Sequence, residues 1–272
     1  DGIRYAQESR GLGDVYKRQG AGSFASSTRA VFGGGLNNTI EFVTIATTGN
    51  ASDFGDLTSG QTEKPAGTSS STRGLFICGE SQPSGTRLNT IQFVTIATTG
   101  NATDFGNLSV AKNGVAALAS ATRGVFSGGY TPTAQSTIEY LNFQSSGGVN
   151  DFGDLLSATQ DHMSGSNNTI GIFSRDTTTQ FITLASTGDA TDFGGDTTVA
   201  RYYGMQSNCS PTRMVIGGGR VSPTVVGTID FFTFATRGDA VSFGEMSVAR
   251  SGYGAGGNST RGIFAGGYTP TI

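Results

Sequence analysis

Few side chains in this sequence could perform covalent or metal-dependent chemistry. The 272 residues include one histidine, His162, and two cysteines, Cys78 and Cys209. Protein zinc, copper and haem sites usually draw on several such ligands, so we expect no metal site and no cofactor. No Gly-x-Ser-x-Gly nucleophile elbow between a strand and a helix can be recognised. We therefore expect no catalytic residue and no enzyme activity, with His162 facing solvent or in a turn and both cysteines as buried free thiols.

The triplet Asp-Phe-Gly is a second candidate for chemistry, because in protein kinases its aspartate holds magnesium. That function needs a glycine-rich phosphate loop, a strand lysine and a His-Arg-Asp loop, none of which is present. We expect instead a turn in which Asp bonds backbone amides, Phe is buried and Gly supplies an unusual φ. The triplets begin at Asp53, Asp104, Asp151 and Asp192, with Ser242-Phe243-Gly244 as a variant.

Arginine recurs at one place in a repeated element and could form a ring of cations around a channel. The alternative, which we favour, is a structural hydrogen bond or ion pair repeated by symmetry. One unit has Ile170 in place of Arg, and the following unit has Ser242 in place of Asp. If each Arg pairs with the Asp of the next unit, the missing Arg and the missing Asp belong to the same pair, so we expect this pairing. The arginines are Arg29, Arg73, Arg123, Arg213 and Arg261.

These motifs belong to a repeat of about 46 residues, since Arg29 and Arg261 are separated by five intervals. The first copy contains a small-residue element at 21–25, a Thr-Arg element ending in Gly-Gly at 28–34, a Thr-Ile-Glu-Phe element at 39–45 and the Phe-Gly triplet at 53–55. The elements are short, rich in β-branched and aromatic residues, and separated by turn residues, which is typical of strands. With 43 Gly, no Trp and only 14% charged residues, the composition excludes a helical bundle.

Four short strands cannot bury both faces of their sheet, so each unit must stack on its neighbours. We predict an all-β fold, a β-propeller of four-stranded antiparallel blades. The small-residue strand should lie innermost, and the Phe of each Asp-Phe-Gly should fill the space between blades. The sequence has six copies of the first two elements but five copies of the other two, so we predict six blades. The sixth blade is incomplete, or it is closed by the N-terminus, with Ile3-Arg4-Tyr5 and Asp14-Val15-Tyr16 as its missing strands.

The order of these elements resembles the kelch-type blade of galactose-oxidase-like propellers over residues 20–272, with Phe in place of the usual Trp. The near-identical sequences of the repeat units are also similar to repetitive structural and appendage proteins of marine bacteriophages. Residues 1–19 lie outside the repeat, and Arg10 to Gln19 resembles translated sequencing-adapter sequence of metagenomic gene predictions. We expect two regions, an artefactual segment 1–19 and a propeller domain 20–272, in a chain that began as a gene fragment.

The net charge of -3 and the scattered Lys and Arg give no basic surface, so we expect no nucleic-acid partner. No signal peptide or apolar run of membrane-spanning length is visible, so we expect no membrane insertion. We predict a non-enzymatic interaction or structural module on a virion or extracellular surface, with a surface glycan or protein as partner and assembly into a larger particle. The alternative is a polysaccharide hydrolase or lyase with a carboxylate site on one rim, which two carboxylates unique to one blade would favour. A third interpretation is that the repeats only form part of a particle surface and bind no ligand.

A ligand should bind the loops that follow the Gly-Gly strands, because these loops vary most between units and variable loops on a rigid scaffold often bind. Tyr offers sugars a flat face with a hydroxyl, and Arg offers directed donors. We expect the opposite face to carry Arg201, Tyr202 and Arg250. The alternative is that these loops are ordinary solvated turns. The candidate binding residues are Arg87, Tyr130, Arg175, Arg220 and Tyr268, in loops 36–38, 80–89, 130–136, 175–178, 220–227 and 268–270.

Overall fold

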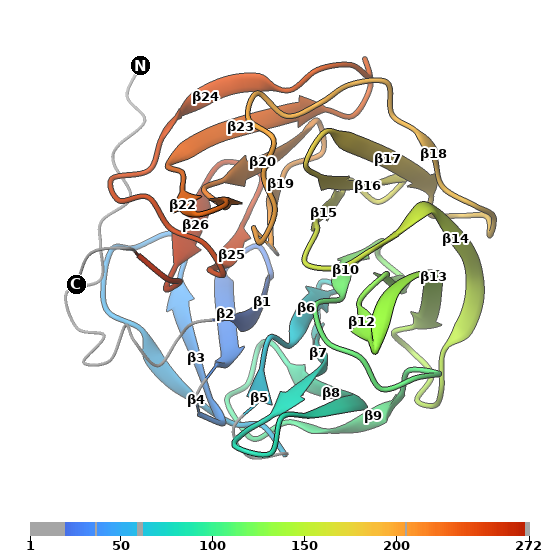
Figure 1. Cartoon of the computed structure of the whole chain (residues 1–272). Helices are drawn as coiled ribbons and strands as arrows, with labels where there is room; N and C mark the ends of the chain where they lie inside the picture. Colours follow the sequence, from blue (N-terminus) through green and yellow to red (C-terminus); the bar gives the residue numbers. More distant parts are fainter. Residues whose placement is uncertain (1–19, 36, 59–61, 205, 270–272) are drawn as a thin grey trace.

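The computed structural model describes residues 20–35, 37–58, 62–204 and 206–269, and within them every regular element is a β-strand. Small antiparallel sheets are arranged around one central axis (Figure 1), so the fold is a β-propeller. The predictions of an all-β fold and of four-stranded antiparallel blades are confirmed. In the described ranges, no helix is long and apolar enough to cross a membrane.

Five blades are complete, and each is numbered here in chain order. Blade 1 contains β1 (Ala21–Ala25), β2 (Arg29–Gly34), β3 (Thr39–Thr44) and β4 (Ser52–Asp56). Blade 2 contains β5 (Thr62–Glu63), β6 (Ala66–Ser69), β7 (Arg73–Ser81), β8 (Thr86–Thr95) and β9 (Thr103–Asn107). Blade 3 contains β10 (Ala116–Ala119), β11 (Arg123–Ser127), β12 (Tyr130–Thr131), β13 (Thr133–Asn142) and β14 (Asn150–Thr159).

Blade 4 contains β15 (Met163–Ser166), β16 (Ile170–Arg175), β17 (Thr178–Thr183) and β18 (Thr191–Asp192). Blade 5 contains β19 (Asn208–Cys209), β20 (Arg213–Gly217), β23 (Thr228–Thr233) and β24 (Val241–Glu245), in the order β19-β20-β23-β24. A separate hairpin of β21 (Arg220–Val221) and β22 (Thr224–Val225) extends from the connection between its second and third strands.

The small-residue strand is innermost in each blade, as predicted. Neighbouring inner strands lie side by side around the axis (Figure 1), so little room remains between them. A Cβ atom at Gly67 in β6 would lie 2.3 Å from the carbonyl oxygen of Ser23 in β1, which is closer than any side chain tolerates. The close approach of these backbones explains why Gly, Ala and Ser dominate this position.

The apolar core lies between blades and not within one sheet, because a single sheet has no second layer of its own. Phe54 of blade 1, 2% exposed, packs with Phe76, Val94 and Ile96 of blade 2. Equivalent clusters hold Phe105, Phe152 and Phe193 between the following blades. The prediction for the Asp-Phe-Gly phenylalanines is confirmed in these four blades, whereas Phe243 of blade 5 is 41% exposed.

The prediction of six blades is wrong in its count, because the structure has five complete blades. The sixth position in the ring holds a two-stranded sheet, β25 (Gly254–Gly257) and β26 (Gly262–Ala265), packed between β19 and β1 (Figure 1). No third or fourth strand joins it in the described part of the chain. Among the described residues, therefore, no outer strands of a sixth blade cover Phe243. The predicted closure by Ile3-Arg4-Tyr5 and Asp14-Val15-Tyr16 lies outside the described residues.

Candidate functional site

Two kinds of connection lie at the same end of the ring. In an antiparallel four-stranded blade, the turn from the second to the third strand and the segment leading to the next blade must emerge together. Tyr202, in the segment leading to blade 5, and Arg220, after its second strand, exchange backbone hydrogen bonds of 3.1 and 2.7 Å. The expectation that Arg201, Tyr202 and Arg250 lie on the opposite face is therefore wrong. We call this end of the ring the loop face.

The loop face brings some of the candidate binding residues together and leaves others apart. Arg87 of blade 2 lies over the ring of Tyr130 of blade 3, with 4.7 Å from Cζ to the ring centre. Arg175 of blade 4 lies over Tyr202, which precedes blade 5, at 5.2 Å. Arg220 is exposed and Tyr268 is 46% exposed, and neither side chain forms a stacked pair or an ion pair among the described residues. The face thus carries two Arg–Tyr pairs, each at a blade junction.

A pocket of about 420 Å³ lies on this face between blades 3 and 4 and is lined by Arg175, His162 and Gln180 among others. His162 is 1% exposed, so the expectation of a solvent-facing or turn histidine is wrong. Its Nε2 lies 2.8 Å from the Ser127 hydroxyl, and its Nδ1 has no hydrogen-bond partner. Burial, aided by the charges of Arg175 and Lys112, lowers the pKa of His162 to about 3.

The contact between Ser127 and His162 has the composition of a nucleophile and its base, yet it lacks their chemistry. Ser127 is fully buried, so a substrate has no access to its hydroxyl. A histidine with a pKa of about 3 is a very weak base, whereas general-base catalysis favours a pKa near the working pH. We interpret the pair as a polar contact that satisfies both groups inside the protein.

Six residues form a ring at the inner edge of the loop face, one immediately before or near each innermost strand. Hydrogen bonds of 2.8 to 2.9 Å link five of the six neighbouring pairs in this ring, each from the amide of one member to the carbonyl of the member before it, as from Asp161 to Gly114 and from Tyr203 to Asp161. Every member has a positive φ, between 52° and 68°. Glycine adopts this conformation freely, whereas other residues incur a cost of about 1 kcal/mol or more. The members are Gly20, Lys64, Gly114, Asp161, Tyr203 and Gly252.

The three non-glycine members of this ring interact with one another. Lys64 Nζ lies 5.0 Å from the ring centre of Tyr203, and the pair share a side-chain hydrogen bond that helps raise the pKa of Lys64 against the effect of its burial. Burial raises the pKa of Tyr203 and of Asp161, although Lys64 opposes both shifts. We call Lys64, Asp161 and Tyr203 the central cluster. A cation, a carboxyl and a phenol together can donate and accept hydrogen bonds from a polar ligand.

The repeated arginines lie away from this face and perform a structural task. The Arg29 guanidinium donates to the carbonyl oxygens of Ile96 and Ala97 in blade 2, at 2.9 and 3.0 Å. Arg123 makes the same contact with Leu184 of blade 4 at 3.0 Å, and Arg261 with Ile45 of blade 1 at 2.7 Å. Four of the five arginines, Arg29, Arg73, Arg123 and Arg261, reach carbonyl oxygens of the next blade, whereas Arg213 makes no such contact among the described residues, and the predicted Asp partner is wrong. The end of the third strand offers them unsatisfied carbonyl groups instead.

No family model matches the chain, and a search of curated proteins finds no match. The residues that the structure describes contain no group of three or more His, Cys, Asp or Glu side chains that could hold a metal ion. Sequence reasoning missed the central cluster, although a signal existed. When the repeats are aligned, glycine precedes the small-residue strand in three units, and Lys64, Asp161 and Tyr203 replace it in the other three.

Proposed function

We propose that this β-propeller is a non-enzymatic interaction module whose loop face recognises a surface glycan. The observation that supports this proposal best is the strained central cluster. Lys64, Asp161 and Tyr203 adopt φ values of 55°, 52° and 64° at positions where glycine would avoid the cost. Residues held in such conformations tend to occur at functional sites, where the side chain is needed despite the strain.

The surroundings of the cluster suit a sugar ligand. The Arg87–Tyr130 and Arg175–Tyr202 pairs present aromatic faces and guanidinium donors on the same end of the ring. Sugars combine apolar ring faces with many hydroxyl groups, so aromatic and charged side chains together can bind them. The likeness to kelch-type blades and to repetitive phage appendage proteins supports a place on a virion or cell surface, where glycans are the available partners.

The test is a glycan array probed with the full chain and with Lys64→Gly, Asp161→Gly and Tyr203→Gly. We expect each variant to keep its stability, or to gain about 1 kcal/mol from the relieved strain, while glycan binding falls at least tenfold. Arg237→Gly is the matched control, because Arg237 also has a positive φ, 44°, but lies in the turn between β23 and β24 at the other end of the ring. Binding that survives all three substitutions would refute the proposed site.

One observation favours a second candidate, a polysaccharide hydrolase or lyase. Asp161 is a carboxyl with a raised pKa, and it belongs to one unit only. Glu63 lies near enough to the cluster to influence the pKa of both Lys64 and Tyr203. The release of new chain ends from a glycan bound on the array would favour the enzyme. Asp161→Asn should then abolish release while binding persists, because the amide keeps the shape and loses the titratable proton.

A further inference from the structure

Two blades are fixed to the segment that precedes them by a buried charge pair. One member is in the segment that leads to the blade, and the other is in the third strand of that blade. Lys112 Nζ lies 2.8 Å from the Glu139 carboxylate of blade 3, and Arg201 Nη2 lies 2.5 Å from the Asp230 carboxylate of blade 5. All four side chains are at most 5% exposed, so in both blades a cation fills the space beside the third strand.

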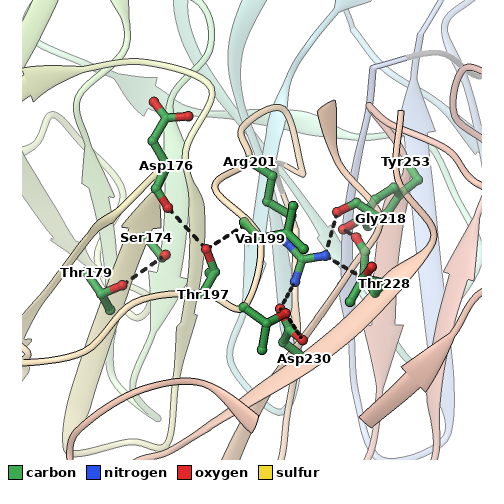
Figure 2. Close-up of polar contacts among 12 residues, drawn as sticks. Ser174, Asp176, Thr179, Thr197, Val199, Arg201, Gly218, Thr228, Asp230 and Tyr253 are labelled. Atoms are coloured by element: carbon green, nitrogen blue, oxygen red, sulfur yellow. Dashed lines mark hydrogen bonds and ion pairs between the residues drawn. The ribbon is translucent and has the colours of Figure 1, made fainter. Parts of the chain in front are cut away.

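Figure 2 shows how the cation fills this space at blade 5. The Arg201 guanidinium contacts Asp230 and donates to the backbone carbonyls of Gly218, at 3.0 Å, and Thr228, at 2.5 Å. Thr198 donates its hydroxyl to both Asp230 oxygens, at 2.7 and 2.8 Å. The cation and the carboxylate thus balance each other inside the protein, as buried charges must to avoid a large cost.

Blade 4 has neither member of this pair. Thr159 stands where blade 5 has Arg201, and Gln180 stands where it has Asp230, as Gln92 does in blade 2. The threonine side chain is much shorter than that of arginine, so it leaves space beside the third strand. The pocket of about 420 Å³ between blades 3 and 4 is lined by both Thr159 and Gln180. The pocket therefore lies where blade 5 holds its buried cation.

The pocket has a buried floor and a rim that solvent reaches. The connection between β16 and β17 is residues 176–177 only, whereas the connection between β20 and β23 spans residues 218–227 and contains a hairpin of its own. Ser157 and Thr178 at the rim are exposed, and Phe173 at the floor is 1% exposed. The volume falls within the range of about 300–1,000 Å³ that is typical of small-molecule sites. A small ligand can therefore enter from the loop face.

The pocket keeps a cation although it lacks the buried carboxylate. Arg175 Nη1 donates to the carbonyl oxygen of Gln160 and lies 3.4 Å from the Thr159 hydroxyl, so the guanidinium lies beside the position that holds the cation in blades 3 and 5. Arg175 Nε lies 3.3 Å from Asp176, whose side chain is 53% exposed, and solvent weakens such a pair. Arg175 Nη2 has no hydrogen-bond partner among the described residues. No buried carboxylate therefore balances this charge within the described part of the chain.

Two further side chains that line the pocket have unused hydrogen-bonding groups. Gln180 Oε1 accepts the Leu156 amide at 2.8 Å, whereas its Nε2 makes no hydrogen bond among the described residues. His162 is 1% exposed, and its Nδ1 has no partner. Buried polar groups are nearly always paired, so an unpaired one needs an explanation. Depending on the tautomer, Nδ1 donates to a carboxylate or accepts from a hydroxyl, and Gln180 Nε2 donates to either.

We propose that this pocket is a subsite for an acidic sugar, whose carboxylate pairs with Arg175 as the carboxylates of blades 3 and 5 pair with their cations. Charge-assisted hydrogen bonds from arginine to a carboxylate are strong, and Gln180 Nε2 supplies a further donor. Ser157 and Thr178 at the rim offer hydroxyl groups to those of the sugar. A cationic ligand would face the charge of Arg175, and a neutral ligand would leave that charge without a buried partner. The inference rests on the proposed function for the sugar part of the ligand, whereas the carboxylate follows from the junction pattern.

The probe is sodium glucuronate, titrated into the untagged full chain while the imidazole NMR signals of His162 are followed. The chain has one histidine, so these signals report on the pocket alone. We expect saturable shifts with glucuronate. Glucose, which has the ring without the carboxylate, and acetate, which has the carboxylate without the ring, should each bind at least tenfold more weakly. Arg175→Gln should weaken glucuronate binding by a similar factor, because the pocket then has no cation for the carboxylate.

Gln180→Glu tests the same interaction from the protein's side. Glu139 shows that glutamate at this position accepts a backbone amide, from Ser109 at 3.0 Å, while it pairs with a cation. The new carboxylate should pair with Arg175 and exclude that of the ligand, so glucuronate binding should fall at least tenfold while the midpoint of urea denaturation is unchanged or higher. Gln144→Glu, the same change at an exposed residue between β13 and β14 at the other end of the ring, is the matched control and should leave binding unchanged.

Three results would overturn the inference. The first is no saturable response of His162 to glucuronate. The second is equal binding of glucose or of acetate, which would show that the pocket does not select a sugar with a carboxylate. The third is undiminished glucuronate binding in both Arg175→Gln and Gln180→Glu. The glycan array tests the proposed function separately, because no residue of the central cluster lines the pocket. Array binding that survives the central-cluster substitutions, together with an intact glucuronate response, would refute the central cluster and leave the pocket standing.

Discussion

The Asp230→Ala substitution tests the buried charge pair between the segment leading to blade 5 and its third strand. Both side chains of the pair are fully buried. Removal of one partner leaves an uncompensated charge inside the protein, which costs about 3–5 kcal/mol. Arg201 would keep its contacts with Gly218 and Thr228, so we expect a loss near the middle of this range, about 4 kcal/mol. For a domain of this size, that loss lowers Tm by roughly 8–16 °C.

The assay is urea denaturation of the full chain, followed by circular dichroism, with two comparisons. Gln92→Ala removes the uncharged equivalent and deprives the Thr58 amide of its acceptor, so it should cost about 1–3 kcal/mol. The double variant Arg201→Leu/Asp230→Leu removes both charges and should regain most of the loss, since apolar replacements of buried pairs are often neutral. Equal losses for Asp230→Ala and Gln92→Ala, or no recovery in the double variant, would refute the argument.

Three further predictions follow from single sites. Arg123→Met should cost about 1–3 kcal/mol in urea denaturation because it leaves the Leu184 and Ala185 carbonyls unpaired, whereas Arg213→Met, which breaks no such bond, should cost under about 0.5 kcal/mol; equal losses would contradict the blade-to-blade role. The single histidine should give an imidazole NMR signal that does not titrate above pH 4, because the pKa of His162 is about 3, and a midpoint near 6.5 would contradict its burial. Between pH 3 and 6.5 the folded state binds fewer protons at this group than the unfolded state does. The contribution of His162 to the free energy of unfolding is therefore complete above pH 6.5 and is lost as the pH falls. Cys78, buried with its pKa raised to about 12, should react with a thiol reagent only after unfolding, and rapid reaction in the native state would contradict its position.

The fold could be predicted from the sequence because every unit repeats the same local pattern. Strand identity, the innermost place of the small-residue strand and the burial of Phe54 and its equivalents all follow from composition and period. The blade count failed for a physical reason. Element counts show how much chain each unit has, but a complete blade requires strands that pair, and only β25 and β26 pair at the sixth position in the described residues.

The candidate site was only partly accessible from sequence. The place of variable-loop residues such as Tyr130 and Arg175 on one face of the ring could be predicted, because turns after Gly-Gly are easily recognised. The error in placing Tyr202 came from treating each loop separately, although antiparallel topology requires alternate connections to emerge at one end. His162 was misplaced because a lone histidine in a polar stretch gives no indication of its burial; its position next to Phe173, at 5.8 Å between ring centres, depends on contacts between blades 3 and 4.

The two ends of the ring differ in how uniform the repeat units are. At one end, most units use the same arginine-to-carbonyl contact, and a uniform contact can hold blades together but cannot distinguish one ligand from another. On the loop face, the units differ at the inner ring, where Lys64, Asp161 and Tyr203 replace glycine, and at the blade junctions, where charged pairs alternate with glutamine. The junction differences are balanced inside the protein, since each buried cation has its carboxylate. The inner-ring differences are not required by packing, because glycine serves in the other three units. A side chain that packing does not require, kept in a strained conformation, supports the proposal that the loop face binds a partner outside the chain.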